Sequence, residues 1–176
     1  MNKLRSAIAA VALTTVYAPA MAGETVLLGP VEIPAPPAGK GQIVFFRPGG
    51  MGMAIGCSVN ENGQKVSSLG SGRYFVMVAA PGRHAFSVKS EAKDELALEV
   101  EPDETQYVAC KIKMGFMVGR PDIAPSTQAA FQGLKHMKMV DADDMNPAAG
   151  ALSADQVTAA LAKPAAAAAA PATPQQ

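Results

Sequence analysis

Hydrophobic and polar residues alternate along the middle of the chain in short runs that are typical of β-strands. In residues 96–101, Leu96, Leu98 and Val100 alternate with small or acidic residues. Successive side chains of a strand point to opposite faces, so this run predicts one buried and one solvated face. Residues 74–79 (YFVMVA) are apolar at nearly every position, which predicts a central strand covered on both faces.

Turn residues separate further runs of this kind at close spacing. Asn62-Gly63 predicts a tight hairpin turn, because both residues tolerate positive φ. The predicted strands cover residues 42–47, 54–59, 64–68, 74–79, 84–89, 96–101 and 105–114. Many short strands with turns between them predict an all-β protein, a small antiparallel β-sandwich spanning residues 40–124.

The N-terminal end reads as an export signal. Lys3 and Arg5 form a basic start, residues 7–17 are apolar, and small residues precede a cleavage site between Ala22 and Gly23. We therefore expect residues 1–22 to be removed and the mature protein to be periplasmic. The apolar run is shorter than the roughly 20 residues that span a bilayer. No cysteine follows the cleavage site, so we expect no lipid anchor.

The segments that flank the predicted sandwich have different compositions. Residues 23–39 contain four prolines and predict an extended lead, which could lie along a sheet edge. Residues 163–176 are almost entirely Ala, Pro, Thr and Gln, which predicts a disordered tail.

Between the sandwich and the tail, residues 125–162 predict a helical extension. Ser126 can cap a short helix that carries Phe131 and Leu134, although residues 135–140 could instead form an edge strand. Ser153 and Gln156 have the spacing of a capping box ahead of residues 157–162.

The two cysteines, Cys57 and Cys110, predict a disulfide across the core. In an oxidising compartment, an even cysteine count in a small domain favours a disulfide. Cys57 shares a strand face with Val59, and Cys110 shares one with Val108, whereas Lys111 faces the other way. Both cysteines are therefore expected to point inward.

Charge does not indicate a ligand class. Without Lys3 and Arg5, the mature chain has 13 basic residues against 15 acidic ones. The basic residues are scattered among acids, whereas binding of nucleic acid needs clustered Lys or Arg. We therefore expect no nucleic-acid partner and no membrane span in the mature chain.

A family resemblance is carried by two motifs, Gly72-Arg73-Tyr74-Phe75 and Ala80-Pro81-Gly82-Arg83-His84. With an opening strand that ends in Arg47 and a later strand with Gln106-Tyr107-Val108, they resemble the DUF2846 family of uncharacterised exported bacterial proteins. That family is similar in turn to PEGA-type β modules. The resemblance covers roughly residues 40–120 and implies a β fold and an envelope location. It assigns no catalytic residue.

Methionine and histidine supply the candidate metal ligands. Eight of the ten methionines follow the signal, and soft thioether sulfur favours Cu(I) in an exported protein. The candidate copper ligands are Met51, Met53, His136, Met137 and Met139. Methionine also fills irregular cores, so packing is the competing interpretation. We expect His84 to be a structural histidine beside the Pro81-Gly82 turn.

No arrangement of residues indicates catalysis. Residues 49–52 (GGMG) lack the Gly-Lys-Ser/Thr of a phosphate loop, and no serine has the Gly-x-Ser-x-Gly surroundings of a hydrolase. Residues 99–104 contain four acids, which are interpreted as a solvated strand end.

These patterns predict an uncharacterised, exported, non-catalytic β-sandwich protein without a cofactor. It would be a binding or structural accessory module of the bacterial cell envelope. Its partner would be an unknown envelope protein or cell-wall component that meets the strand edges and residues 48–56. The alternatives are a periplasmic copper-binding protein and an unrecognised small hydrolase.

Overall fold

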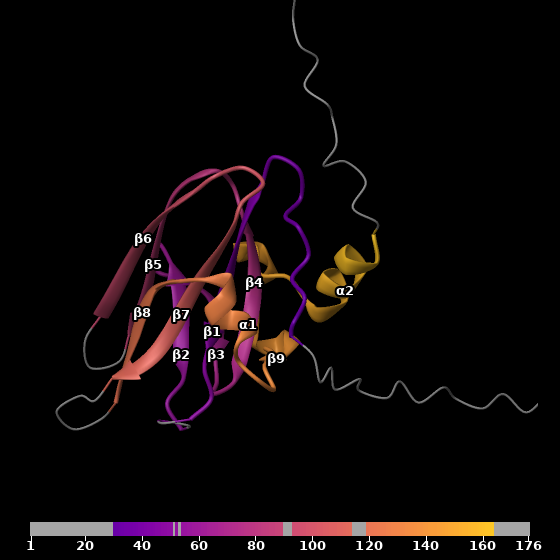
Figure 1. Cartoon of the computed structure of the whole chain (residues 1–176). Helices are drawn as coiled ribbons and strands as arrows, with labels where there is room; N and C mark the ends of the chain where they lie inside the picture. Colours follow the sequence, from indigo (N-terminus) through magenta and orange to yellow (C-terminus); the bar gives the residue numbers. More distant parts are fainter. Residues whose placement is uncertain (1–29, 51, 53, 90–92, 114–118, 164–176) are drawn as a thin grey trace, which may run out of the picture.

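Two β-sheets pack face to face in the computed structural model, which describes residues 30–50, 52, 54–89, 93–113 and 119–163 (Figure 1). The larger sheet has the order β8-β7-β1-β4-β9, with strands β1 (Gly41–Arg47), β4 (Arg73–Ala79), β7 (Thr105–Lys113), β8 (Arg120–Ser126) and β9 (Lys138–Met139). The smaller sheet has the order β3-β2-β5-β6, with strands β2 (Cys57–Glu61), β3 (Gln64–Leu69), β5 (Gly82–Lys89) and β6 (Lys93–Val100). The all-β sandwich predicted from the sequence is confirmed.

The larger sheet is mixed in direction, which differs from a wholly antiparallel sandwich. Strand β1 runs antiparallel to β4 but parallel to β7, from Gln42 opposite Thr105 to Phe46 opposite Ala109. The short strand β9 also runs parallel to its neighbour β4. Parallel neighbours need a long connection, and here the chain leaves β1, builds β4 and the whole smaller sheet, and only then returns as β7.

The central strands of the larger sheet, β1 and β4, are buried on both faces. Between the sheets, the Phe45 ring lies 4.9 Å from Phe75 and 5.0 Å from Phe86. On the outer face, Phe131 contacts three aromatic rings, those of Phe46, Tyr74 and Tyr107. Two separate hydrophobic cores result, which explains why β1 and β4 are apolar at adjacent positions.

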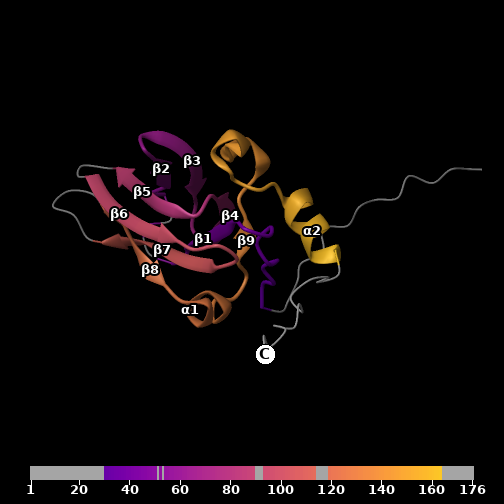
Figure 2. The ribbon, with the colours of Figure 1, turned by 90° about the horizontal axis from the view of Figure 1, so that it is seen from above.

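A third layer covers the outer face of the larger sheet and is seen end-on in Figure 2. It consists of the lead, helix α1 (Gln128–Gln132) and helix α2 (Ala154–Ala162). Val31 and Ile33 of the lead pack against the outer core, and Val157 of α2 is buried in it. The lead therefore crosses a sheet face, rather than following a sheet edge as the sequence suggested.

The extension contains both the helix and the strand that the sequence left as alternatives. Thr127, not Ser126, caps α1, and its hydroxyl accepts from Ala130 N. Ser126 instead ends β8, where it lies opposite Tyr107. The chain then forms β9 and two 3₁₀ turns, η1 (Ala142–Asp144) and η2 (Pro147–Ala149). The capping box of Ser153 and Gln156 is confirmed at the start of α2.

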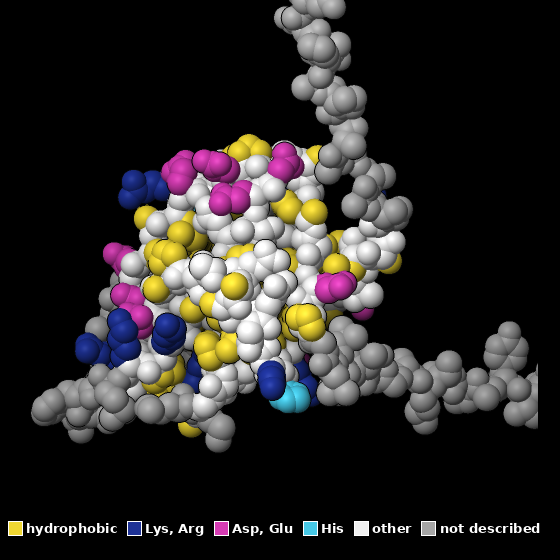
Figure 3. All heavy atoms as spheres, in the orientation of Figure 1, with side chains coloured by type: hydrophobic (Ala, Val, Ile, Leu, Met, Phe, Trp, Pro, Cys, Tyr) yellow, Lys and Arg dark blue, Asp and Glu magenta, His cyan; other side chains and the backbone are white. Residues whose placement is uncertain are grey.

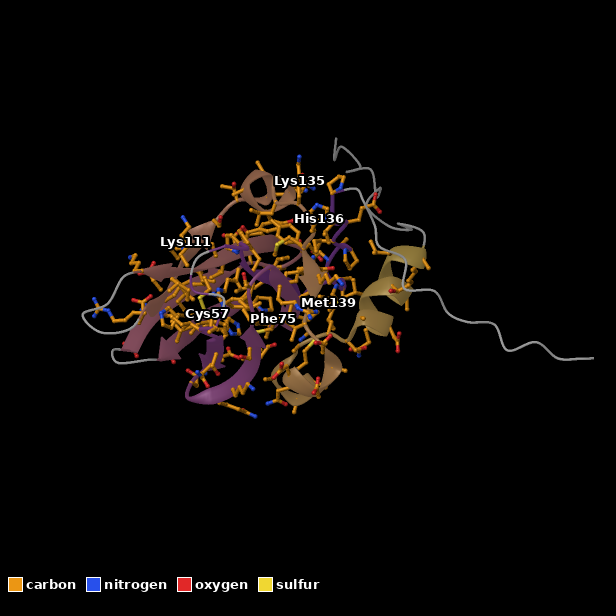
Figure 4. The ribbon with its side chains drawn as sticks, turned by 90° about the horizontal axis from the view of Figure 1, so that it is seen from below. Cys57, Phe75, Lys111, Lys135, His136 and Met139 are labelled. Carbon is orange, nitrogen blue, oxygen red and sulfur yellow. A yellow bond between two sulfur atoms is a disulfide. The ribbon has the colours of Figure 1, made fainter. Side chains whose placement is uncertain are left out.

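The predicted disulfide is confirmed. Cys57 on β2 is bonded to Cys110 on β7, and both residues are fully buried between the sheets. Figure 4 shows Cys57 and Phe75 in this interior, whereas Lys111 lies on the outside. The bond therefore links one sheet to the other.

Predictions for both ends of the chain concern residues that the structure does not describe. The expected signal peptide with its Ala22 to Gly23 cleavage site, and residues 164–176 of the expected tail, lie outside the described residues. Within the described residues, none of the helices has the length and hydropathy needed to cross a membrane.

Candidate functional site

The four outer edges of the two sheets differ in how they are protected. Strand β8 carries Pro121 and Pro125, and β9 has only two residues. Along β3, the carbonyls of Lys65 and Val66 accept hydrogen bonds from Asn146. These are the usual ways in which a protein protects a strand edge from pairing with another chain. Strand β6, with eight residues and no proline, forms the fourth edge.

The register fixes which main-chain groups of β6 point outward. Asn62 N donates to Ala85 O (3.1 Å), so the main-chain groups of Ala85 on β5 point toward β2. Ala85 lies opposite Ala97, and in such a pair the groups of Ala97 point away from β5. The same holds for Glu99, whose carbonyl accepts from the Gln106 side chain (2.6 Å). Within the described residues, Ala97 has no backbone partner on this side.

Acidic side chains gather where β6 leads into β7. Glu99, Glu101 and Asp103 are exposed, and Glu104 is half-buried. Figure 3 shows this acidic end at the top of the molecule. Asp103 has a positive φ of 59° and accepts a hydrogen bond from Gly39 N (2.9 Å), which holds the turn to the lead. The solvated strand end expected from the sequence is therefore tied to the lead through the Asp103 carboxylate.

A pocket of about 420 Å³ opens beside this acidic end, between the edges of the two sheets. Its lining residues come from β6, the turn into β7, the start of β7, the end of β8 and the start of α1. They are Leu98, Glu104, Thr105, Gln106, Tyr107, Pro125, Ser126, Thr127 and Gln128. Burial raises the pKa of Tyr107, so its phenol stays neutral at physiological pH. The pocket therefore offers hydroxyl and amide groups, a short apolar wall and one carboxylate.

A second pocket, of about 340 Å³, lies beside His84 at the start of β5. His84 Nδ1 contacts the Glu61 carboxylate, and its Nε2 lies 2.8 Å from Ala80 O. Both partners accept hydrogen bonds, so a doubly protonated ring satisfies both. Burial by itself lowers the pKa of His84, but the hydrogen bonds to Glu61 and Ala80 and the charges of Glu61 and Glu99 outweigh it and raise the pKa. The structural role expected for His84 beside the Pro81-Gly82 turn fits these contacts.

The connection between β1 and β2 is held by a buried arginine. The guanidinium of Arg47 donates to the carbonyls of Gly52, Ile55 and Leu69, with 2.6 Å to Gly52 and 3.4 Å to Leu69. Only 1% of Arg47 is exposed. Burial lowers its pKa, yet an arginine stays charged at any physiological pH. No local pattern of residues indicates that this terminal residue of β1 points into the protein.

The described candidate copper ligands differ in burial and are not all close together. Met137 is buried in the outer core, and Met139 packs against that core. His136 is exposed, has a positive φ of 58°, and lies apart from Met139 in Figure 4. Met51 and Met53 lie outside the described residues. Among the described residues, no three His, Cys, Asp or Glu side chains come together as a metal site.

Comparison with known proteins identifies a family for most of the sandwich. A family model, described as a protein of unknown function (DUF2846), matches residues 37–121. This range contains β1 to β7, the disulfide, and both motifs that carried the resemblance. No curated protein and no solved structure matches the chain.

Proposed function

Residues 37–121 of this chain belong to the DUF2846 family, and from that premise we propose that the protein is an exported, non-catalytic binding module of the bacterial cell envelope. In this function, a partner protein pairs an extended segment with the outer edge of β6. The connection formed by residues 48–56 follows the Arg47 end of β1, the end away from Gly41 and the acidic turn, and would supply a second contact surface.

The observation that carries this proposal is the outward direction of the Ala97 main-chain groups. An exposed strand edge can bind an extended segment through main-chain hydrogen bonds, with specificity supplied by alternate side chains. Prolines, shortness or hydrogen bonds to the extension protect the other edges. On β6 the Gln106 side chain occupies the outward Glu99 carbonyl, so the outward groups of Ala97 are where such pairing would occur.

The disulfide supports the proposed export. Cys57 and Cys110 join two sheets across a core, and such bonds persist in oxidising compartments. Fractionation of producing cells tests this part directly. We expect a processed chain beginning at Gly23 in the periplasmic fraction, and an intact precursor in the cytosol would contradict it.

Crosslinking in living cells tests the binding function. A photoreactive amino acid placed at Glu99 would lie on the outer edge of β6, where a paired segment would pass. We expect one partner to be captured after illumination, and the same probe placed at Lys111, on the far side of the larger sheet, to leave that partner uncaptured.

Ala97→Pro is the decisive companion variant. Proline has no main-chain N–H, so it removes the donor at the centre of the edge without adding charge. Combined with the probe at Glu99, it is expected to abolish capture, and the thermal unfolding curve shows whether the sandwich remains folded. Undiminished capture by a folded Ala97→Pro protein would overturn strand pairing at β6.

A further inference from the structure

The pocket beside β6 has one charged lining group among neutral ones. Glu104 Oε2 accepts from Gln106 Nε2 (2.9 Å), and within the described residues its other carboxylate oxygen has no hydrogen-bond partner. Thr105, Tyr107 and Ser126 add hydroxyl oxygens that can accept further hydrogen bonds. A group with several N–H donors and a positive charge would satisfy these acceptors.

The surroundings of the pocket also favour a cation. Glu99 and Asp103 are neighbours in the sequence of the lining residues Leu98 and Glu104, and both are exposed, as is Glu101. Figure 3 shows the top of the molecule as mainly acidic. Arg83, opposite Glu99 in the register, offsets part of this charge. Clefts lined by one sign of charge concentrate ligands of the opposite sign.

The pocket and the strand edge are adjacent in the chain. Ala97 presents its main-chain groups outward, and the next residue, Leu98, forms a wall of the pocket. A segment that pairs with β6 has side chains alternating between its two faces. Its side chains on one face would therefore reach toward the pocket, while its backbone bonds to Ala97.

Accordingly, we propose that the pocket binds the ammonium or guanidinium end of a Lys or Arg side chain, carried by an extended partner segment that pairs with β6. The proposal rests on the proposed function and specifies the chemistry of the partner. Leu98 would pack against the methylene stem of that side chain, while Glu104 and the hydroxyl groups would receive its charged end.

A fluorescein-labelled peptide of alternating Lys and Thr tests this by fluorescence anisotropy with the whole mature chain. We expect saturable binding that weakens at high salt, because the attraction is partly screened. The matching peptide of alternating Glu and Thr is expected not to bind. If the Lys-Thr peptide fails to bind while the probe at Glu99 still captures a partner, the cationic class is wrong and the binding function stands.

Variants locate the binding. Glu104→Gln removes the charge in the pocket and is expected to weaken binding roughly tenfold or more, the size of a lost charge-assisted hydrogen bond. Asp122→Asn is the control, because Asp122 forms an ion pair with Lys113 elsewhere on the larger sheet. Equal affinities of Glu104→Gln and the parent chain would overturn the pocket assignment.

A chemically altered probe separates strand pairing from charge alone. Two forms of the same Lys-Thr peptide are compared, one methylated on the backbone nitrogen of every Lys and the other on that of every Thr. Each form lacks the N–H donors on one side of the extended peptide and keeps every lysine side chain. We expect the peptide methylated on the pairing side to lose binding. Unchanged binding of both methylated forms would contradict pairing with β6, as would equally tight binding of lysine amide alone.

Discussion

Cys57 on β2 and Cys110 on β7 form a covalent bridge between the two sheets of the sandwich. They are 53 positions apart in the sequence, so the bond closes a long loop. In the chain-entropy description, closing a loop of that length lowers the entropy of the unfolded chain and stabilises the folded protein by about 4 kcal/mol. We expect the free energy of unfolding of the Cys57→Ala, Cys110→Ala double variant to be lower than that of the parent by about this amount. Urea denaturation measures the difference.

Reductant provides the control for this prediction. The parent chain with its disulfide reduced is expected to approach the stability of the double variant. A double variant as stable as the oxidised parent would show that packing alone determines the stability.

The contacts of His84 predict that stability depends on pH above the ordinary histidine pKa. The pKa of His84 is raised in the folded state, so the folded protein holds the proton more tightly than the unfolded chain. The resulting stabilisation is complete below the usual histidine pKa of about 6.5. It is lost as pH rises through the higher folded-state value.

Urea unfolding at a series of pH values measures this effect. The parent chain is expected to lose stability as pH rises through that interval, and His84→Asn is expected to remove this part of the slope. Glu61→Gln leaves the ring in place but removes the negative charge next to it, so it should flatten the slope as well. An identical slope in His84→Asn would show that other groups cause it.

Arg47→Met is expected to destabilise the protein and loosen the connection between β1 and β2. The substitution leaves the carbonyls of Gly52, Ile55 and Leu69 without their donor. Unsatisfied buried groups cost about 1–3 kcal/mol each, so we expect a loss of about 3 kcal/mol after partial relaxation. Hydrogen exchange should increase at residues 54–56.

Arg120→Met is the matched control for this prediction, because Arg120 is exposed on β8. An exposed substitution of this type usually changes stability by about 0.5 kcal/mol or less. Equal losses in the two variants would contradict a special role for the buried guanidinium.

Gly41→Ala is expected to disturb the junction between β1 and the acidic turn. A Cβ atom at Gly41 would lie 2.2 Å from Val100 Cγ1 and 2.7 Å from Glu101 O. The end of β6 and the turn that follows it must therefore shift. Overpacking of this kind typically costs about 1–3 kcal/mol. Thermal or urea unfolding measures the loss. Gly49→Ala, where a Cβ meets nothing within 4 Å, should leave stability nearly unchanged.

Alternation of side chains along a strand was enough to predict most of the sandwich. It correctly placed Cys57 and Cys110 inside and Lys111 outside. Strand β8 was missed because Pro121 and Pro125 argue against a strand, and an edge strand tolerates proline where no sheet hydrogen bond is needed. Because Ser126 ends this strand, the cap of α1 is Thr127 and not Ser126, the residue predicted from the sequence.

Features that depend on distant parts of the chain could not be read from local patterns. The parallel pairing of β1 with β7 joins Gln42 to Thr105, and nothing near either residue indicates it. Arg47 is buried because the carbonyls of a later connection converge on it. The pocket beside β6 likewise combines residues from strands of both sheets, so only the fold brings them together.

The central position of β1 has a consequence for how the protein is made. This apolar strand appears early in the chain, yet its parallel partner β7 begins only at Thr105. A chain that emerges N-terminus first must therefore leave one edge of residues 41–47 unpaired until β7 is made, by which point more than half of the chain has emerged. Such an apolar segment with an unpaired edge is prone to aggregate, so the interval between synthesis of β1 and of β7 is the stage of biogenesis at which this sandwich is most open to misassembly.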